Sequence, residues 1–373
     1  MAQSAIFKHS VKYIFTKKLT NFSNCLRNGH VFRHLSSKST KTKTASSVYG
    51  AMKIFDRNAK MLQKERAAQR EDYHLAEYIK EEIGWRTADR VFDVKRTFKN
   101  AVELGAGRGY VSRHFLPDSV EKVTLCDTSQ THLDKAIIGD GVKYEKVIMD
   151  EENLEFPEDS VDLLVSSLAL HWVNDLPGCF DRIMRCLKPD GVFLASVFGG
   201  GTLLELRQAL QLAEAERCGG VAPHISPFTQ PQDVGGLLTA AGFTLQTVDV
   251  DALRVWFPSA WHVMRDVRAL GEGNAALSRP PHLPRSLQFA AAAVYDLMYG
   301  KDFPERGSRG VPATFQIINW VGWKPHPSQP APRAPGSAQR SLRDLAATPA
   351  TSATAATSAT ATTQYNIMNA SNK

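Results

Sequence analysis

Between residues 100 and 200 of the 373-residue chain, short apolar runs alternate with more polar stretches of helical length. Five of these runs predict strands, at 101–105, 122–127, 142–149, 161–167 and 191–198. The segments between them leave room for crossover helices, and this alternation is typical of a parallel sheet with helices on both faces. We therefore expect an α/β, Rossmann-like fold with a mostly parallel sheet.

Both flanks of this core carry further helical patterns. Residues 51–95 are charged but carry an apolar stripe at Leu75, Tyr78, Ile79 and Ile83, which predicts a helical N-terminal extension. After residue 200, the pattern predicts helices at 203–217, 232–241, 259–270 and 286–299, and strands at 243–257 and 313–323. We expect these strands to close the sheet, and the helices to form a cover over its ligand-binding edge.

The basic residues are concentrated at the N-terminus. Nine of the 45 Lys and Arg residues and none of the 38 Asp and Glu residues lie within residues 1–50, so the net charge of +7 does not describe the rest of the chain. That remainder is nearly neutral, which removes the electrostatic argument for binding nucleic acid. A basic, Ser/Thr-rich and acid-free N-terminus is typical of a mitochondrial transit peptide, which we place at 1–35, with a linker at 36–50.

The folded body is expected at 51–325, with a ligand-binding core at 100–200 and the cover and last strands at 201–325. Residues 326–373 are rich in Pro, Ala and Thr and poor in large apolar side chains, which predicts a disordered, low-complexity tail. No apolar run reaches the roughly 18 residues of a membrane-spanning helix, so we expect any membrane contact to be peripheral.

A glycine-rich segment follows the first predicted strand and reads ELGAGRG at 103–109. Gly105 permits a sharp turn, Gly107 lets a ligand approach the backbone, and Gly109 lets a following helix pack closely on the sheet. The free amide groups at the start of that helix would suit an anionic group. Glu103 stands two residues before the first glycine, where a carboxylate suits a cationic amine such as that of a methionyl group.

Acidic residues also end the next two predicted strands. Asp127 stands 22 residues after Gly105, at a position where a carboxylate accepts hydrogen bonds from ribose hydroxyls. Asp150 and Glu151 follow the third strand, where an acid can meet the exocyclic amine of adenine. Each acid alone is also a common helix cap. Together with the loop they predict an S-adenosylmethionine site that consists of Glu103, Gly105, Gly107, Gly109, Asp127, Asp150 and Glu151.

His171 and Trp172 follow the fourth predicted strand, at the sheet edge where open α/β folds bind ligands. They are candidates for contact with a substrate, although side chains at this place also pack a helix against the sheet. His132 and Asp134 are the closest approach to a metal-binding set. Residues two apart do not face the same way on a helix, so we predict no metal site.

Five segments outside the glycine loop carry a family resemblance: LLVSSLALHWVNDLP at 163–177, LKPDGVF at 187–193, FGGGTLLELR at 198–207, PHISPFT at 223–229 and VPATFQIINWVGWK at 311–324. Within the class I methyltransferases, they resemble the mitochondrial complex I assembly factors described as protein-arginine hydroxylases. The malonyl-carrier-protein methyltransferases of biotin synthesis are similar at a greater distance. Gly201 departs from the family's FGGDTL stretch, where an Asp stands.

The resemblance implies an S-adenosylmethionine-binding protein of the mitochondrial matrix, peripheral to the inner membrane. It also implies hydroxylation of an arginine in an iron–sulfur subunit of complex I, alongside other assembly factors. Such chemistry needs an oxidant, which the sequence does not identify. A guanidinium groove would be lined by Glu205, Trp172 and His171. The residues leave open a conventional methyltransferase acting on a carboxyl or protein nucleophile, and a non-catalytic assembly chaperone.

Overall fold

The computed structural model describes residues 53–303, 308–331 and 334–337. The expected transit peptide at 1–35, the linker at 36–50 and the tail from 338 onward lie outside these residues. The helical N-terminal extension consists of α2 (Arg57–Ala68), the 3-10 turn η2 (Tyr73–Leu75) and α3 (Tyr78–Phe92). In the part of the chain that the structure describes, no helix is long and apolar enough to span a membrane.

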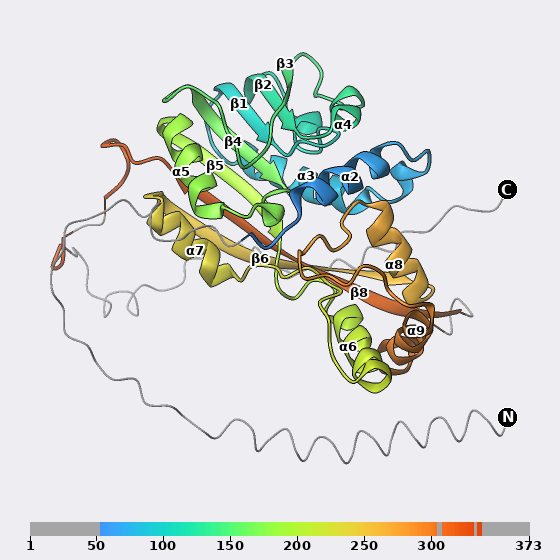
Figure 1. The fold of residues 1–373 in the computed structure, drawn as a ribbon. Helices are drawn as coiled ribbons and strands as arrows, with labels where there is room; N and C mark the ends of the chain where they lie inside the picture. The colour runs from blue at the N-terminus through green and yellow to red at the C-terminus, as the bar shows by residue number, and fades with distance from the viewer. Residues whose placement is uncertain (1–52, 304–307, 332–333, 338–373) are drawn as a thin grey trace, which may run out of the picture. The chain divides into compact units, whose positions relative to one another are not determined.

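One eight-stranded sheet has the order β3-β2-β1-β4-β5-β8-β6, with β7 paired to β8 (Figure 1). Strands β1 to β5 pair in parallel, and β8 lies antiparallel between β5 and β6. The prediction of a mostly parallel, Rossmann-like sheet is therefore confirmed. The strands are β1 (Phe98–Leu104), β2 (Val120–Asp127), β3 (Lys143–Ile148), β4 (Val161–Ser167), β5 (Leu187–Phe198), β6 (Thr244–Phe257), β7 (Lys301–Phe303) and β8 (Ser308–Trp323).

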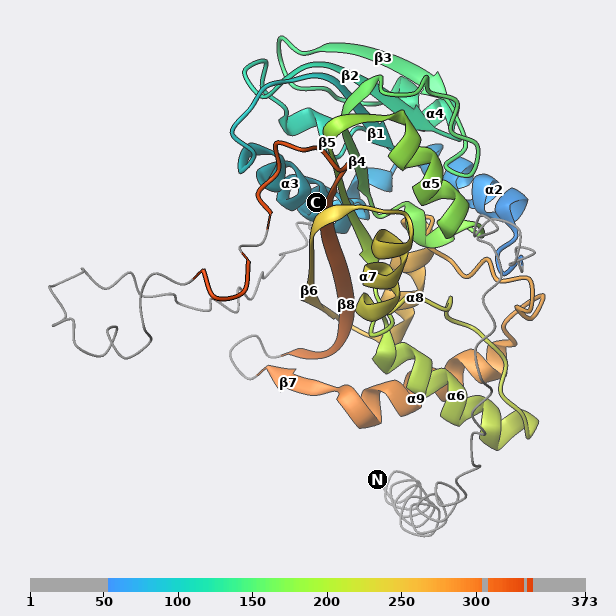
Figure 2. The ribbon, with the colours of Figure 1, turned by 90° about the vertical axis from the view of Figure 1, so that its left-hand side faces the viewer.

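Helices cover both faces of the sheet, as the pattern predicts (Figure 2). On one face, α3 buries Ala88 in an apolar cluster with the first strands. On the opposite face, α5 (Leu176–Cys186) and α7 (Pro231–Ala240) bury Phe180 and their other apolar side chains against β4, β5 and β8. The apolar side chains of the central strands are thus enclosed on both sides.

The connections after β1 and β2 are shorter than predicted. The glycine loop leads into a single 3-10 turn, η3 (Ser112–His114), and α4 after β2 spans only Gln130–Asp134. The prediction of a full helix directly after the loop is wrong. Gly109 has a left-handed backbone with φ of 72°, and Pro117 follows eight residues later, so few residues remain in which a helix could form.

Helices α6 (Leu204–Cys218), α8 (Ala260–Ala269) and α9 (Arg285–Tyr299) form the cover (Figure 1). Their apolar side chains share one cluster with Leu168 and Phe198, at the carboxyl ends of β4 and β5. The cover therefore lies at the edge of the sheet where ligands are expected. Strand β7, which the pattern did not predict, pairs with the beginning of β8.

Contacts with the sheet continue past residue 325, where we predicted the tail to begin. Gln329 donates from Nε2 to Asp190 Oδ1 at 2.9 Å and to the Lys324 carbonyl at 2.8 Å. The Thr244 hydroxyl donates to Gln329 Oε1 at 2.8 Å. Residues 326–331 thus attach to the body through polar contacts, which a count of large apolar side chains does not detect.

Candidate functional site

The glycine loop lies at the carboxyl end of β1. Gly105 and Gly107 have φ angles of 68° and 55°, and Gly109 shares this left-handed conformation, which side chains rarely adopt. Space is limited as well. A Cβ at Gly105 would lie 2.2 Å from the Cβ of Ala169, and a Cβ at Gly107 would lie 2.8 Å from Cε2 of Tyr110. The loop therefore depends on glycine at these positions.

Glu103 supports the loop from beneath. Its side chain belongs to a residue that is 1% exposed, and its two oxygens accept from the backbone amides of Val111 and Ser112, each at 3.0 Å. Burial raises the pKa of Glu103 to about 6, although the hydrogen bonds oppose this rise. The carboxylate faces the backbone of the following turn. In this arrangement it shapes the loop, whereas the sequence had led us to expect that it would contact an amine of the ligand.

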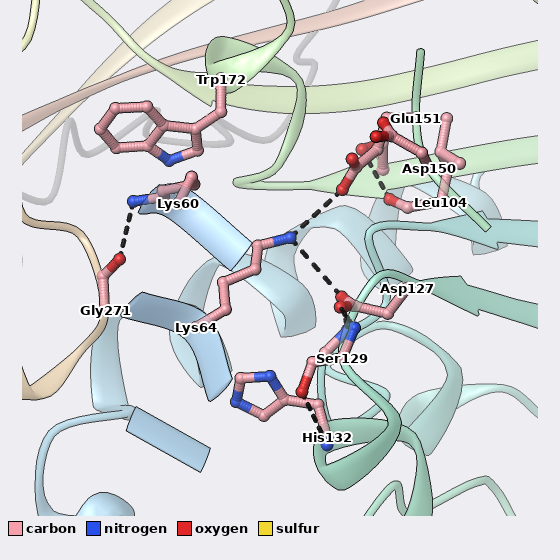
Figure 3. A network of polar contacts seen from close by, with 12 residues as sticks. Lys60, Lys64, Leu104, Asp127, Ser129, His132, Asp150, Glu151, Trp172 and Gly271 are labelled. Carbon is pink, nitrogen blue, oxygen red and sulfur yellow. Dashed lines mark hydrogen bonds and ion pairs between the residues drawn. The ribbon is translucent and has the colours of Figure 1, made fainter. Parts of the chain in front are cut away.

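Asp127, Asp150 and Glu151 gather at this same edge, as predicted (Figure 3). Asp127 Oδ2 accepts from the Gly107 amide at 2.9 Å, so the carboxylate that ends β2 is joined directly to the glycine loop. Its Oδ1 accepts from the Ser129 amide at 2.8 Å. Each carboxylate oxygen has a second lone pair, which leaves Asp127 able to accept from ligand hydroxyls as well.

Helix α2 places two cations among these acids, Arg57 and Lys64, the second of which is labelled in Figure 3. Lys64 Nζ lies 3.2 Å from Glu151 Oε1 and 3.8 Å from Asp127 Oδ2. Arg57 Nη2 lies 2.6 Å from Asp150 Oδ1 and also pairs with Glu151. Burial opposes ionisation of Glu151, but Lys64 and Arg57 lower its pKa to about 2. Sequence analysis missed both cations because only the tertiary fold brings α2 to the sheet edge.

Four more side chains line the site, although the sequence analysis did not assign them to a cofactor: Tyr73, Lys80, Tyr110 and His132. The hydroxyls of Tyr73 and Tyr110 lie 3.1 Å apart. His132 is 2% exposed, and neither ring nitrogen has a hydrogen-bond partner among the described residues. Burial lowers the pKa of His132 to about 3, so its ring is neutral and keeps one donor and one acceptor for a ligand.

His171 and Trp172 lie in a 3-10 turn after β4, and both face Glu272 in the loop after α8. Trp172 Nε1 donates to Glu272 Oε2 at 2.7 Å, and His171 Nε2 lies 3.4 Å from the same oxygen. Lys80 Nζ lies 3.0 Å from Glu272 Oε1. Lys60 Nζ lies 3.3 Å from Glu272 Oε2 and 3.3 Å from the centroid of the Trp172 ring. The structure thus brings the two predicted residues together around a carboxylate that sequence reasoning missed.

Burial governs the ionisation of this cluster. It lowers the pKa of His171, whose ring is therefore neutral near neutral pH. It also lowers the pKa of Lys60 to about 7, although Glu272 opposes this shift. Burial disfavours the ionised form of Glu272, but Lys60 and Lys80 hold its pKa well below the ordinary value. His171 Nδ1 has no partner among the described residues and can accept a proton or a hydrogen bond.

Glu205 does not join His171 and Trp172. Its Oε1 accepts from the Thr314 hydroxyl at 2.5 Å, and its Oε2 accepts from the Thr314 amide at 3.2 Å. The first turn of α6 faces β8, so this carboxylate is buried against the sheet. The expectation that Glu205 lines a groove with the other two residues is wrong.

The described ranges contain no group of three or more His, Cys, Asp or Glu side chains that is arranged to hold a metal ion. His132 and Asp134 point to different surroundings, as helix geometry predicts. Asp134 is exposed and accepts from Gln130 Nε2 at 2.5 Å, whereas His132 is buried beside the glycine loop.

Comparison with known proteins shows the family to which this chain belongs. Residues 102–195 match the family model described as a methyltransferase domain. Arginine-hydroxylase NDUFAF5, mitochondrial, of Danio rerio is 48% identical over 277 residues, which cover 74% of this chain and 84% of that protein. The chain belongs to the arginine-hydroxylase NDUFAF5 family. The human protein of the same name is 47% identical over 277 residues, covering 74% of this chain and 79% of its own length.

This chain also has a more distant relative that is named as a methyltransferase. The malonyl-acyl-carrier-protein O-methyltransferase of Gallionella capsiferriformans is 28% identical over 284 residues, covering 74% of this chain and 93% of that protein. Both the near and the distant resemblance inferred from the sequence segments are therefore confirmed.

Proposed function

We propose that this chain hydroxylates an arginine of an iron–sulfur subunit of respiratory complex I during assembly, together with other assembly factors. The observation that carries the proposal is the 48% identity to a protein named mitochondrial arginine-hydroxylase, over 84% of that protein. The basic, acid-free segment at 1–35 supports import into the mitochondrial matrix. We place the protein at the matrix face of the inner membrane, as a peripheral component.

S-adenosylmethionine is the proposed cofactor. Gly105 and Gly107 would hold its methionyl end close to the loop backbone, in a loop whose shape Glu103 and Gly109 maintain. Asp127 would accept from the ribose hydroxyls through its remaining lone pairs, and Asp150 or Glu151 would accept from the adenine amine. When bound, this cofactor supplies an electrophilic methyl group on a sulfonium. His132 fits the proposal as a buried, neutral ring without a partner among the described residues.

Lys64 competes with the cofactor for the hydrogen-bond acceptors of this site. Its ammonium lies between Glu151 and Asp127, the two carboxylates that the cofactor would use. A neutral hydroxyl or amine that donates to these oxygens competes with a buried cation for the same acceptors. We therefore propose that α2 adjusts its position when the cofactor binds.

His171 and Trp172 are the proposed substrate-contacting residues. Trp172 is buried beneath Lys60, so a substrate guanidinium would bind its aromatic face by displacing that ammonium. The neutral His171 could hold a proton at Nδ1. Insertion of oxygen into a C–H bond requires an oxidant in addition to protein side chains.

A conventional methyltransferase is the second candidate, because residues 102–195 match a methyltransferase domain. Methyl transfer requires a nucleophile held in line with the sulfonium, which is mainly a matter of orientation. A non-catalytic assembly chaperone is the third candidate. It would use the same fold as a scaffold.

Binding of the cofactor is tested by calorimetry on the purified protein, with S-adenosylmethionine as ligand and NAD as competitor. We expect saturable binding of S-adenosylmethionine that NAD does not displace. Absence of binding by S-adenosylmethionine would contradict the cofactor assignment and favour the chaperone.

The reaction is tested by mass spectrometry of the iron–sulfur subunit from cells depleted of the protein. Loss of one oxygen atom's mass from an arginine supports hydroxylation. Loss of one methyl group's mass supports the methyltransferase, and an unchanged subunit supports the chaperone. Return of the modification with the wild-type chain, but not with Asp127→Asn, would connect the chemistry to the site.

A further inference from the structure

A second cavity, of about 240 Å³, lies on the cover between α6 and the segment at 222–227 that follows it. It shares no lining residue with the glycine-loop site. Its walls combine apolar side chains, Ile54, Leu210, Pro223 and Pro227 among them, with polar ones such as Gln211 and Ser278. Two of the segments that carry the family resemblance, at 198–207 and 223–229, meet here.

Arg207 supplies a cation to this cavity without a matching acid. No carboxylate of the described residues lies within 4.0 Å of its guanidinium. Its contacts are long hydrogen bonds to the carbonyls of Gly200, at 3.3 Å, and Ser226, at 3.4 Å. Burial, with no opposing carboxylate, lowers the pKa of Arg207. A guanidinium has five N–H groups, so several donors remain available to an anion.

Ser226 also lines this cavity. The residue is 2% exposed, and its hydroxyl has no hydrogen-bond partner among the described residues. Buried hydroxyls are normally hydrogen-bonded, because an unpaired one loses its interaction with water. Its own carbonyl accepts from Arg207, so the free hydroxyl and the guanidinium are close neighbours.

Glu214 contacts two other groups of this segment. The Ala222 amide donates to Glu214 Oε2 at 2.7 Å, and His224 Nε2 lies 3.1 Å from the same oxygen without forming a hydrogen bond. Glu214 thus holds the beginning of the segment and forms no ion pair with Arg207. The guanidinium of Arg207 therefore remains without a carboxylate partner at this cavity.

The cavity adjoins the proposed substrate side of the molecule. Ile54, which lines it, donates from its amide to Asn174 Oδ1 at 2.8 Å. The next residue, Phe55, packs edge-to-face on Trp172 with ring centroids 5.4 Å apart. The cavity is thus connected through Ile54 and Phe55 to the packing around Trp172.

We propose that this cavity is a binding site for a carboxylate, which the guanidinium of Arg207 and the hydroxyl of Ser226 hold together. Arg presents paired N–H groups that match the two oxygens of a carboxylate. A monoanion balances the single uncompensated cation, whereas a phosphate dianion would retain excess negative charge between apolar walls. The apolar walls suit the alkyl part of an acidic side chain or of a small carboxylic acid.

The test is calorimetry on the purified full chain with two monoanionic probes, butyrate and a blocked peptide that carries one Glu, at constant ionic strength set with chloride. We expect saturable binding of at least one probe. Arg207→Gln should weaken that binding about tenfold or more, because it removes a charge-assisted pair. Ser226→Ala, which keeps the cation, should weaken it about fivefold through loss of one hydrogen bond. Arg217→Gln, an exposed arginine on the same helix, is the matched control and should bind as the wild type does.

Preference for the peptide would identify a protein substrate as the source of the carboxylate, and preference for butyrate would identify a free acid. Either result supports the site. Equal affinity of Arg207→Gln and the wild type, or binding of neither probe to the wild type, would overturn it. If Arg207→Gln fails to fold, Ser226→Ala decides by the same comparison, since unchanged affinity there contradicts the proposed contact.

Discussion

Lys64 and Glu151 are separated by 86 intervening residues and meet at 3.2 Å in the candidate cofactor site. Helix α2 supplies the cation, and the segment after β3 supplies the carboxylate. The pair is buried, so neither partner can exchange its contact for water without movement of α2. The carboxylates at this sheet edge are therefore paired with a cation from the protein's own chain.

S-adenosylmethionine should raise the unfolding temperature of the Lys64→Gln variant more than it raises that of the wild type. Removing this buried cation destabilises the unliganded protein, although Glu151 keeps Arg57 as a partner. It also removes the competitor for the Asp127 and Glu151 oxygens. The measurement is the shift in unfolding temperature with S-adenosylmethionine. Arg66→Gln, an exposed site on the same helix, serves as control. An unchanged shift in the Lys64 variant would contradict the competition.

Substitution Gly107→Val should abolish cofactor binding. The new side chain would occupy a left-handed backbone position, at a cost of about 1–2 kcal/mol, and would displace the Tyr110 ring from the loop. Gly219→Val is the control, because Gly219 has a φ of 69° but no heavy atom within 4 Å of the added Cβ. Calorimetry should show no binding by the first variant and wild-type affinity in the second. Retained affinity in Gly107→Val would refute the loop assignment.

Substitution Asp127→Asn should weaken S-adenosylmethionine binding by about 1–3 kcal/mol, the cost of losing hydrogen bonds to a charged acceptor. The change keeps the size of the side chain and removes its negative charge. Titration calorimetry on this variant is compared with Asp134→Asn, an exposed acid seven residues later. Equal affinities in all three proteins would place the ribose elsewhere.

Protonation of Glu151 should make the free energy of unfolding depend on pH in the acidic range. Its pKa is lowered from the ordinary 4.5 to about 2, so the folded state binds the proton less tightly than the unfolded chain does. This contribution, roughly 3 kcal/mol, is complete above pH 4.5 and is lost as the pH falls toward 2. Urea unfolding at pH 7, 4.5 and 3.5 should show a smaller acid-induced loss in Glu151→Gln than in the wild type. Exposed Glu155→Gln should behave as the wild type does.

Substitution Glu272→Leu should destabilise the protein by about 3–5 kcal/mol, because it leaves the buried ammonium groups of Lys60 and Lys80 without their carboxylate. Chemical denaturation provides the free energy of unfolding. The comparable change at the exposed Glu216 of α6 should cost far less. A similar cost at both positions would show that the cluster around His171 contributes little.

The sequence predicts the parts of this site that depend on position along a strand. Asp127 and Glu151 could be selected because carboxyl ends of parallel strands share one edge, and Gly107 because a tight loop needs its backbone freedom. Lys64 could not be selected, since its role depends on how α2 docks on the sheet. Glu272 comes from a loop after α8 and could not be paired with Trp172 without the fold.

Other expectations depended on local rules that a tertiary contact overrides. Glu103 was assigned to the ligand from its spacing to Gly105, but the absence of a full helix after the loop leaves backbone amides at 111 and 112 that this carboxylate satisfies. Gln329 belongs to a Pro-rich stretch, yet its amide is anchored by Asp190 and Thr244. Composition describes average tendencies and does not detect such single polar anchors.

The position of β8 has a consequence for the order in which the molecule can be completed. This strand, Ser308–Trp323, fills the space between β5 and β6, yet it is the last of the described strands along the chain. A chain that is delivered N-terminus first, from a ribosome or through a translocation channel, holds β5 and β6 with facing unpaired edges until residue 323 has emerged. Unpaired edges invite pairing with other chains. The protein therefore reaches its closed, aggregation-resistant form only after nearly all of its described body has been delivered.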